Sequence, residues 1–222
     1  MKVTIIGGHG KVAILTAELL AQRGDSVTSI IRNPAQVAAV ESTGASALVL
    51  SVESASTEDM AAAFAGSDAI VWSAGAGGGI PERTYAVDRD AAIRSMDAAE
   101  KAGVKRYVMV SFATASPQFL VPEDDSFFPY MDAKIAADQY LRASALDFTI
   151  LGPGLLTLDA PTGLLNPSSD PAAGPEASKT SRGNVALSII ATLDQPATIG
   201  KTINYSDGQL PVAEAILTDG DK

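Results

Sequence analysis

Cysteine is absent from this 222-residue sequence, and histidine occurs once, at His9. A chain without cysteine has no disulfide framework and no thiolate metal site, and one histidine leaves little material for an imidazole zinc site. We therefore expect no metal. Long apolar runs are also missing, since Val185–Leu193 falls far short of the roughly 20 residues of a membrane-spanning helix. Gly7 and Gly8 end the first apolar run before it could form a secretory signal, which predicts a cytoplasmic protein.

Positive charge is scarce as well. Lys and Arg total 16 against 26 Asp and Glu, which gives a formal net charge of −10. No run of like charge concentrates a basic patch, so we expect neither nucleic acid nor an anionic membrane as a partner. Hydrophobic residues make up 46% of the chain, enough for a substantial core, and the length corresponds to one or two domains of about 150 residues each.

Short β-branched runs alternate with Ala- and Leu-rich segments of helical length up to about residue 151. The expected strands are Val3–Ile6, Ser26–Ile31, Ala47–Leu50, Ala69–Ser73, Arg106–Val110 and Phe148–Leu151. The expected helices are Lys11–Arg23, Pro34–Ser42, Thr57–Ala65, Pro81–Ala102 and Pro129–Ser144. Strands joined by helical crossovers pair in parallel, so the sequence predicts an α/β fold with a doubly wound, Rossmann-type sheet covered by helices on both faces.

A glycine-rich turn follows the first expected strand and opens the first expected helix. It consists of Gly7, Gly8, His9, Gly10, Lys11, Val12 and Ala13. Small residues at this spacing let the backbone approach a pyrophosphate, and the helix N-terminus offers free N–H groups. The context of strand, turn and helix makes this a dinucleotide-binding candidate rather than a plain turn. His9 and Lys11 are within reach of the phosphates; the alternatives are a tolerated turn residue and a surface lysine.

The second expected strand ends at Arg32-Asn33 rather than at an acidic residue. An acid there would accept a hydrogen bond from a ribose 2′-hydroxyl, whereas an arginine pairs with a 2′-phosphate. Asp25 lies at the wrong end of that strand to replace the acid. The sequence therefore predicts NADP(H) over NAD(H), the alternative for Arg32 being an ordinary solvated charge.

A second glycine-rich segment, Ser73 to Gly79, ends the fourth expected strand at the same sheet edge. Its first four residues, Ser73, Ala74, Gly75 and Ala76, are further cofactor-binding candidates, since a backbone with few side chains lets a ligand lie close. A flexible hinge would have the same composition.

Residues 152–180 contain prolines at 153, 161, 167, 171 and 175 and four glycines, which predicts a long surface segment without helix or sheet interior. After it we expect a helix at Arg182–Leu193, a strand at Lys201–Tyr205 and a short helix at Val212–Leu217. We interpret residues 1–222 as one domain, with a cofactor-binding core at 1–151 and a small substrate-side lobe at 152–222. A long loop in such a fold typically walls a ligand crevice.

Tyr130 and Lys134 are four residues apart in an expected helix and share one face. A lysine ammonium near a phenol lowers its pKa, which would suit Tyr130 as a proton donor to a carbonyl under reduction. Ser111 ends the fifth expected strand and could hydrogen-bond the same carbonyl. A surface tyrosine packed against a lysine stem would give the same pattern.

At this point the sequence resembles the atypical short-chain dehydrogenase/reductases, in particular their compact NAD(P)H-binding, NmrA-like or epimerase-like group. The resemblance covers nearly the whole chain. It depends on the segments VTIIGGHGKVA, IIRNP, GSDAIVWSAGAG, VDRDAAIRSMDAAEKAGVKRYVMVSF, YMDAKIAADQYLRASALDFTILGPG, SRGNVALSIIATL and GKTINYSDGQLPVAEAI.

The resemblance implies that Ser111, Tyr130 and Lys134 match the Ser-Tyr-Lys catalytic set of the wider superfamily, in which the lysine also holds the nicotinamide ribose. It also implies cofactor-binding positions at Ser51, Val52, Pro153 and Gly154. Two positions depart from the family: Ser51 stands where relatives commonly have Asp, and Gly152 replaces an Arg before Pro153.

Aromatic residues gather between Ser111 and Tyr130, and we expect this segment and residues 152–180 to form substrate walls for an apolar carbonyl or quinone. The substrate-binding candidates are Phe112, Phe128 and Leu155. An acidic solvated loop with its aromatics in the core is the alternative interpretation.

The first functional hypothesis is an NADPH-dependent reductase of small carbonyl, quinone or flavin-like substrates. The second is a non-catalytic NADP(H)-sensing regulator, and only the first requires Tyr130 to be chemically active. A nucleotide-sugar epimerase ranks last, because about 70 residues after Leu151 leave little room for its usual substrate domain. We expect a small-molecule substrate and a monomer or homodimer.

Overall fold

The structure, a computed structural model, describes residues 1–77, 80–167 and 178–218. Within these residues a nine-stranded sheet has the order β11-β8-β10-β6-β5-β4-β1-β2-β3. Its parallel strands are β1 (Lys2–Ile6), β2 (Ser26–Ile31), β3 (Ser46–Val49), β4 (Ala69–Trp72), β5 (Arg106–Val110), β6 (Asp147–Pro153) and β10 (Lys201–Asp207). The doubly wound Rossmann-type sheet that the sequence predicts is therefore confirmed, and strand order reverses between β1 and β4.

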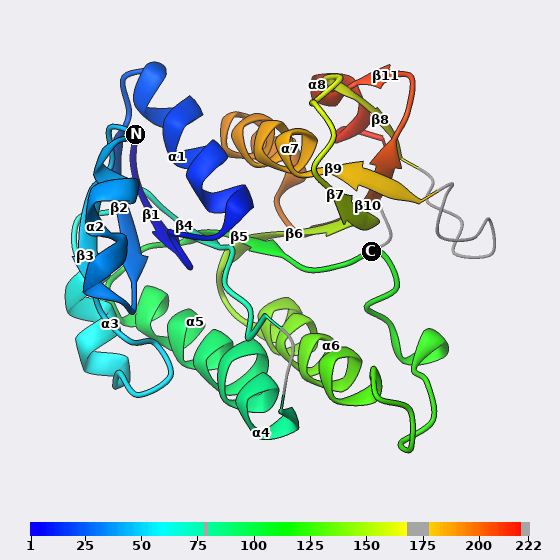
Figure 1. The fold of residues 1–222 in the computed structure, drawn as a ribbon, viewed down its shortest axis with the longest axis horizontal. Coiled ribbons are helices and arrows are strands. Elements are labelled where there is room, and N and C mark those ends of the chain that lie inside the picture. Colours follow the sequence, from blue (N-terminus) through cyan, green and yellow to red (C-terminus); the bar gives the residue numbers. More distant parts are fainter. Residues whose placement is uncertain (78–79, 168–177, 219–222) are drawn as a thin grey trace.

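Helices cover both faces of this sheet, as Figure 1 shows. One layer contains α1 (Lys11–Gln22) and α7 (Arg182–Asp194), and the other contains α3 (Thr57–Phe64), α5 (Ala92–Lys101) and α6 (Phe128–Ala143). Shorter helices are α2 (Val37–Glu41), α4 (Pro81–Thr84) and α8 (Val212–Ala215).

The core is divided by the sheet into two hydrophobic clusters. Ile5 and Ile6 are both fully buried, yet Ile5 packs in the cluster with α1 and Ile6 in the cluster with α3 and α5. Successive strand residues point to opposite faces, so both must be apolar where helices cover the two faces. All four residues of β4 are buried, as expected of a central parallel strand.

The expected helix at Pro81–Ala102 differs from the observed one in its middle. Between α4 and α5, residues Tyr85–Ala91 form a π-helical turn. Such turns insert an extra residue and change which side chains face the sheet, and they are frequent at functional sites. Here the π-turn contains the buried Asp88.

The prediction that residues 152–180 lack sheet structure is wrong for the part that the structure describes. β7 (Leu155–Thr157) pairs with β9 (Lys179–Ser181), and β8 (Leu164–Asn166) lies antiparallel between β10 and β11 (Leu210–Pro211). The prolines do not interrupt these strands, because Pro153 ends β6 while Pro161 and Pro167 lie outside them. Pro171 and Pro175 lie outside the described residues. None of the described helices is both long and apolar enough to cross a membrane.

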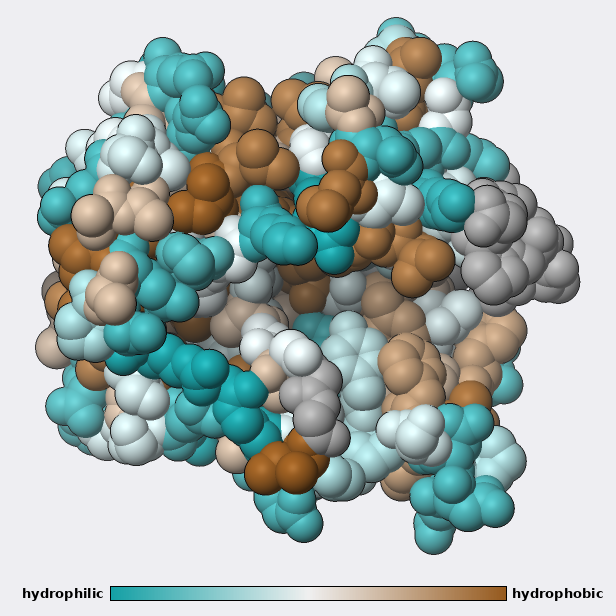
Figure 2. Space-filling view, in the orientation of Figure 1, coloured by the Kyte–Doolittle hydropathy of each residue, from teal (hydrophilic) through white to brown (hydrophobic). Residues whose placement is uncertain are grey.

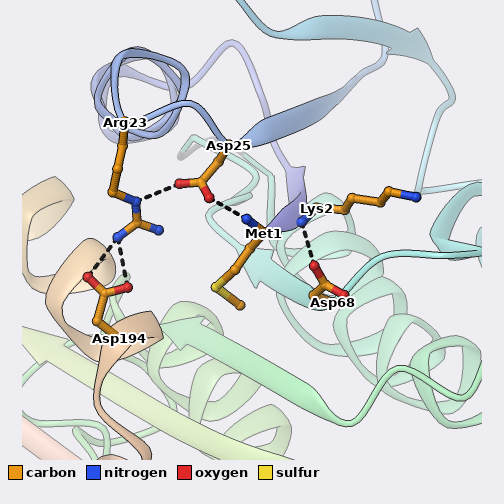
Figure 3. A network of polar contacts seen from close by, with 6 residues as sticks. All are labelled: Met1, Lys2, Arg23, Asp25, Asp68 and Asp194. Atoms are coloured by element: carbon orange, nitrogen blue, oxygen red, sulfur yellow. Dashed lines mark hydrogen bonds and ion pairs between the residues drawn. The ribbon is translucent and has the colours of Figure 1, made fainter.

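The N-terminus is tied to α1 and α7 by a chain of ion pairs (Figure 3). The Met1 ammonium contacts Asp25 at 2.5 Å, and Arg23 donates to Asp25 at 2.6 Å and to Asp194, at the end of α7, at 2.7 Å. Burial raises the pKa of Asp25, but the hydrogen bonds from the Met1 ammonium and Arg23 outweigh it and hold that pKa below its ordinary value. The ionised form of Asp25 therefore stabilises the fold.

Asp25→Asn should lower the free energy of unfolding at pH 7 by about 1 kcal/mol. A lowered folded-state pKa contributes stability above the unfolded pKa of about 3.9, and this contribution is lost as the pH falls through the folded value. Urea unfolding at pH 7 and at about pH 2.5 checks this, with exposed Asp124→Asn as the control. A deficit of the same size at both pH values would contradict the ionic explanation.

Candidate functional site

A cavity of about 310 Å³ opens where the carboxyl ends of β1, β2, β3 and β4 meet, at the point where strand order reverses. Ligands of open α/β sheets bind at this place. Figure 2 shows the molecule hollowed between its two helical layers. The cavity is lined by the predicted cofactor residues Gly7, His9, Gly10, Arg32, Ser51, Val52, Ser73, Ala74, Gly75 and Ala76, together with unpredicted Gln36, Glu53, Gly77, Arg83 and others.

The glycine-rich turn is shaped by close approach of backbone segments. Gly7 has φ +81°, and a Cβ on it would lie 2.6 Å from the Ala74 Cα. A Cβ on Gly8 would lie 2.5 Å from the Ser29 Cβ, and one on Gly10 would lie 3.1 Å from the Gly7 carbonyl oxygen. Side chains at these positions would therefore fill the turn or push it away from its neighbours.

Gly10 is also the N-cap of α1, which has no capping side chain and no acidic residue in its first turn. The first backbone N–H groups of a helix have no partner within the helix, and they favour an anion. The Val12 side chain is buried in the core, so this predicted residue offers only its backbone, while Lys11 is exposed. The free N–H groups and the glycine-rich turn fit a dinucleotide pyrophosphate.

Charged side chains form part of the cavity wall. Arg32 is exposed and contacts the Glu53 carboxylate at 3.3 Å, and Arg83 contacts the same carboxylate at 2.8 Å. Sequence reasoning found Arg32 but missed Glu53 and Arg83. Glu53 directly follows the predicted Ser51 and Val52, and this was the available signal.

A second cavity, of about 300 Å³, shares the lining residue Ala76 with the first. Its lining includes Tyr130 and Asp88 and is completed by Pro81, Thr84, Ser126, Phe127 and Pro129. The Tyr130 ring lies 5.3 Å from the Phe112 ring and 5.2 Å from the Phe127 ring, between centroids. Tyr130 therefore stands in an aromatic cluster beside the crevice where a dinucleotide would lie.

The lowered pKa that the sequence predicts for Tyr130 is wrong. Burial first, and then the negative charges of Asp88 and Asp138, raise the pKa of Tyr130. The Lys134 ammonium instead donates to the Val110 carbonyl at 2.9 Å. Burial raises the pKa of Asp88 and of Asp138, and the positive charge of Lys134 makes both rises smaller. Tyr130 therefore remains a protonated phenol at neutral pH, the form that can donate a proton.

Ser111 lies at the end of β5 as predicted, but its hydroxyl donates to the Asp138 carboxylate at 2.5 Å. Asp138 is fully buried, and its other carboxylate oxygen has no hydrogen-bond partner among the residues that the structure describes. Sequence reasoning missed Asp138, although it follows Lys134 by one helical turn. In this arrangement the Ser111 hydroxyl proton is not directed at a substrate.

Asp88 was also missed. One of its oxygens accepts the Ala76 N–H at 2.9 Å, and this bond ties the π-turn to the second glycine-rich segment. Gly78 and Gly79, the end of that predicted segment, lie outside the described residues. Asp88 thus lines the Tyr130 cavity and holds Ala76, a residue that also lines the cofactor crevice.

The remaining predicted residues belong to the segments around Tyr130 and to β6 and β7. Phe112 contacts Tyr130, Phe128 begins α6, and Leu155 is exposed in β7. Pro153 ends β6, and the Gly154 N–H donates to the Tyr205 carbonyl at 2.9 Å. A Cβ on Gly154 would lie 1.6 Å from the Ser178 carbonyl oxygen, so this glycine is required by packing within the lobe.

Comparisons with known proteins agree with this geometry. The family described as NAD(P)H-binding matches residues 7–196. The chain is 36% identical over 218 residues to the uncharacterized sugar epimerase YhfK of Bacillus subtilis, covering 97% of this chain and 99% of the relative. It is 37% identical over 221 residues to the protein YMR090W of Saccharomyces cerevisiae, covering 97% of each. The solved structure of the oxidoreductase ylbE from Lactococcus lactis has a TM-score of 0.84 at 29% identity, covering 100% of this chain and 99% of that one.

Proposed function

Because the chain belongs to the NAD(P)H-binding family, which confirms its resemblance to the atypical short-chain dehydrogenase/reductases, we propose that it is an NADPH-dependent oxidoreductase. Its acceptor would be a small carbonyl, quinone or flavin-like compound. The observation that carries the proposal is that Ala76 lines both the cofactor crevice and the cavity of Tyr130 and Asp88.

Different residues of the chain bind different parts of the cofactor. The turn from Gly7 to Gly10 and the N-terminus of α1 hold the pyrophosphate, and Arg32 pairs with the 2′-phosphate. Ala74 to Ala76 form the wall along which the cofactor extends toward Tyr130. Bound NADPH supplies the hydride for the acceptor.

Tyr130 donates the proton that the reduced acceptor needs, since its raised pKa keeps the phenol protonated until the acceptor takes on negative charge. Asp88 lines the same cavity, and its negative charge helps to raise the pKa of Tyr130 and so to keep the phenol protonated. Lys134 balances the charges of Asp88 and Asp138 and so holds this buried set together. Phe112 and Phe127 keep water from the phenol.

A non-catalytic sensor of NADP(H) is the second candidate. It is favoured by the hydrogen bond that the Ser111 hydroxyl donates to Asp138. In a reductase, the resemblance implies that this hydroxyl bonds the substrate carbonyl instead. The two candidates differ in whether NADPH is consumed. An epimerase that oxidises and then re-reduces its substrate would likewise show no net consumption.

The test is NADPH oxidation, followed by absorbance, against a panel of quinones, aldehydes, ketones and flavins. An oxidoreductase consumes NADPH with at least one acceptor class. Binding of NADPH without consumption by any acceptor would contradict the proposed reductase and would leave the sensor and the epimerase as alternatives.

Arg32→Ala should weaken NADPH binding roughly 10- to 100-fold, because a charge-assisted bond to the 2′-phosphate is lost, at about 1.5–3 kcal/mol. NADH has no 2′-phosphate, so its affinity should change little. Titration of intrinsic fluorescence or calorimetry measures both dissociation constants. Equal weakening of the two nucleotides would contradict the assignment of Arg32.

A further inference from the structure

Glu53 occupies an unexpected place in the cofactor crevice, since its carboxylate lies between two arginines. One oxygen contacts Arg83 Nε at 2.8 Å, and the other contacts Arg32 Nη1 at 3.3 Å. All three side chains line the cavity. The Glu53 carboxylate is therefore already paired with Arg32, the cation assigned above to the 2′-phosphate.

The backbone holds Glu53 in this position. The Nη2 group of Arg94, in α5, donates hydrogen bonds to the carbonyl oxygens of Val52 and Glu53, at 2.9 and 3.0 Å. The loop closes on itself as well, because the N–H groups of Ser54 and Ala55 donate to the Ser51 carbonyl. The Glu53 side chain is partly buried, whereas Arg32 is exposed. Arg32 is thus the freer partner of the pair.

Arg83 adds a second link to the crevice. In addition to its contact with Glu53, its guanidinium donates to the Ala76 carbonyl. Glu53 therefore helps to orient an arginine that braces the second glycine-rich segment. A substitution at position 53 must keep an acceptor for Arg83 if it is to test charge alone.

A carboxylate at this wall acts in opposite directions on the two forms of the cofactor. It competes with a 2′-phosphate for Arg32 and repels the phosphate charge. Toward a ribose that lacks the phosphate, it is the acceptor that NAD-binding sites commonly supply for the 2′-hydroxyl. Two arginines and one glutamate leave a net charge of +1 at the wall, which still favours the phosphate.

We propose that Glu53 sets nucleotide selectivity in this crevice by limiting the preference for NADPH. Its carboxylate competes with the 2′-phosphate of NADPH for Arg32, and it accepts a hydrogen bond from the 2′-hydroxyl of NADH. The proposal rests on the function proposed above, because it requires a dinucleotide in this crevice. The loop after β3 then helps to decide between NADPH and NADH, a choice that the sequence analysis assigned only to Arg32 at the end of β2.

The test is binding of NADPH and NADH to Glu53→Gln, measured by calorimetry without any acceptor. Glutamine keeps an oxygen to accept from Arg83 but has no charge. NADPH affinity should rise about tenfold, equivalent to about 1.4 kcal/mol, while NADH affinity stays the same or falls. Glu82→Gln is the matched control, since it removes the same charge from an exposed side chain in α4 outside the cavity lining, and it should leave the ratio unchanged.

A double variant identifies the cation through which Glu53 acts. In Arg32→Ala, adding Glu53→Gln should raise NADPH affinity by less than about threefold, because the competition for Arg32 no longer exists. The proposal is overturned if Glu53→Gln leaves the ratio of NADPH affinity to NADH affinity unchanged, whether or not both affinities rise. If the unaltered protein binds neither nucleotide, the proposed function itself fails, and that result is distinct from an unchanged ratio.

Discussion

Gly7→Ala should abolish measurable NADPH binding, weakening it more than about 100-fold, and should lower the free energy of unfolding by about 2 kcal/mol or more. Gly7 has φ +81°, and its new Cβ would lie 2.6 Å from the Ala74 Cα, 2.7 Å from the Ala74 nitrogen and 2.8 Å from the Ser73 carbonyl oxygen. All three atoms belong to the backbone, so no side chain can move aside. The turn and the segment beside it must separate, and both line the crevice.

Gly24→Ala separates the two causes of this effect. Gly24 has φ +90°, but a Cβ there would meet nothing within 4 Å. It should therefore cost about 1 kcal/mol of stability from backbone strain alone and leave NADPH binding unchanged. Thermal or urea unfolding and nucleotide titration of both variants check this. If Gly7→Ala behaves like Gly24→Ala in both measurements, the turn does not hold the cofactor.

Tyr130→Phe should lower kcat roughly 10²- to 10⁴-fold, the usual contribution of a general acid. The substitution removes only the hydroxyl, and the ring contacts with Phe112 and Phe127 remain, so NADPH affinity should change by no more than about twofold. Steady-state kinetics with an active acceptor, together with nucleotide titration, measure the two quantities.

Tyr140→Phe is the control on the same helix. The Tyr140 side chain is exposed, and its hydroxyl donates to Asp97 at 2.6 Å, away from the cavity. Its kcat should equal that of the parent. An unchanged kcat in Tyr130→Phe would remove Tyr130 from the reaction.

Much of the fold follows from local sequence patterns. β4 could be predicted because four consecutive apolar residues, Ala69 to Trp72, require burial on both faces of a sheet. The turn at Gly7 could be predicted because it stands between a strand and a helix. β10 was predicted as well, but the short strands β7, β8 and β9 of the C-terminal lobe could not be, since they have three residues each and depend on partners distant in the chain.

The chemistry of the site depends on contacts that residue spacing does not contain. Tyr130 and Lys134 do share a helix, but the direction of the Lys134 ammonium is decided by the Val110 carbonyl at the end of β5. Burial then raises the pKa of Tyr130, the opposite of what the pair alone suggests. Asp88 reaches the cavity from a π-turn within an apparently regular helical sequence. Glu53 reaches Arg32 from a different loop.

The central claim is that the cofactor crevice and the Tyr130 cavity form one site. A crystal structure of the NADP⁺ complex tests it most directly. We expect the 2′-phosphate at Arg32, the pyrophosphate on the turn from Gly7 to Gly10, and the nicotinamide at Ala76, facing the Tyr130 hydroxyl. A nicotinamide directed away from Ala76, with Tyr130 separated from it by protein, would show that the crevice and the cavity are separate sites.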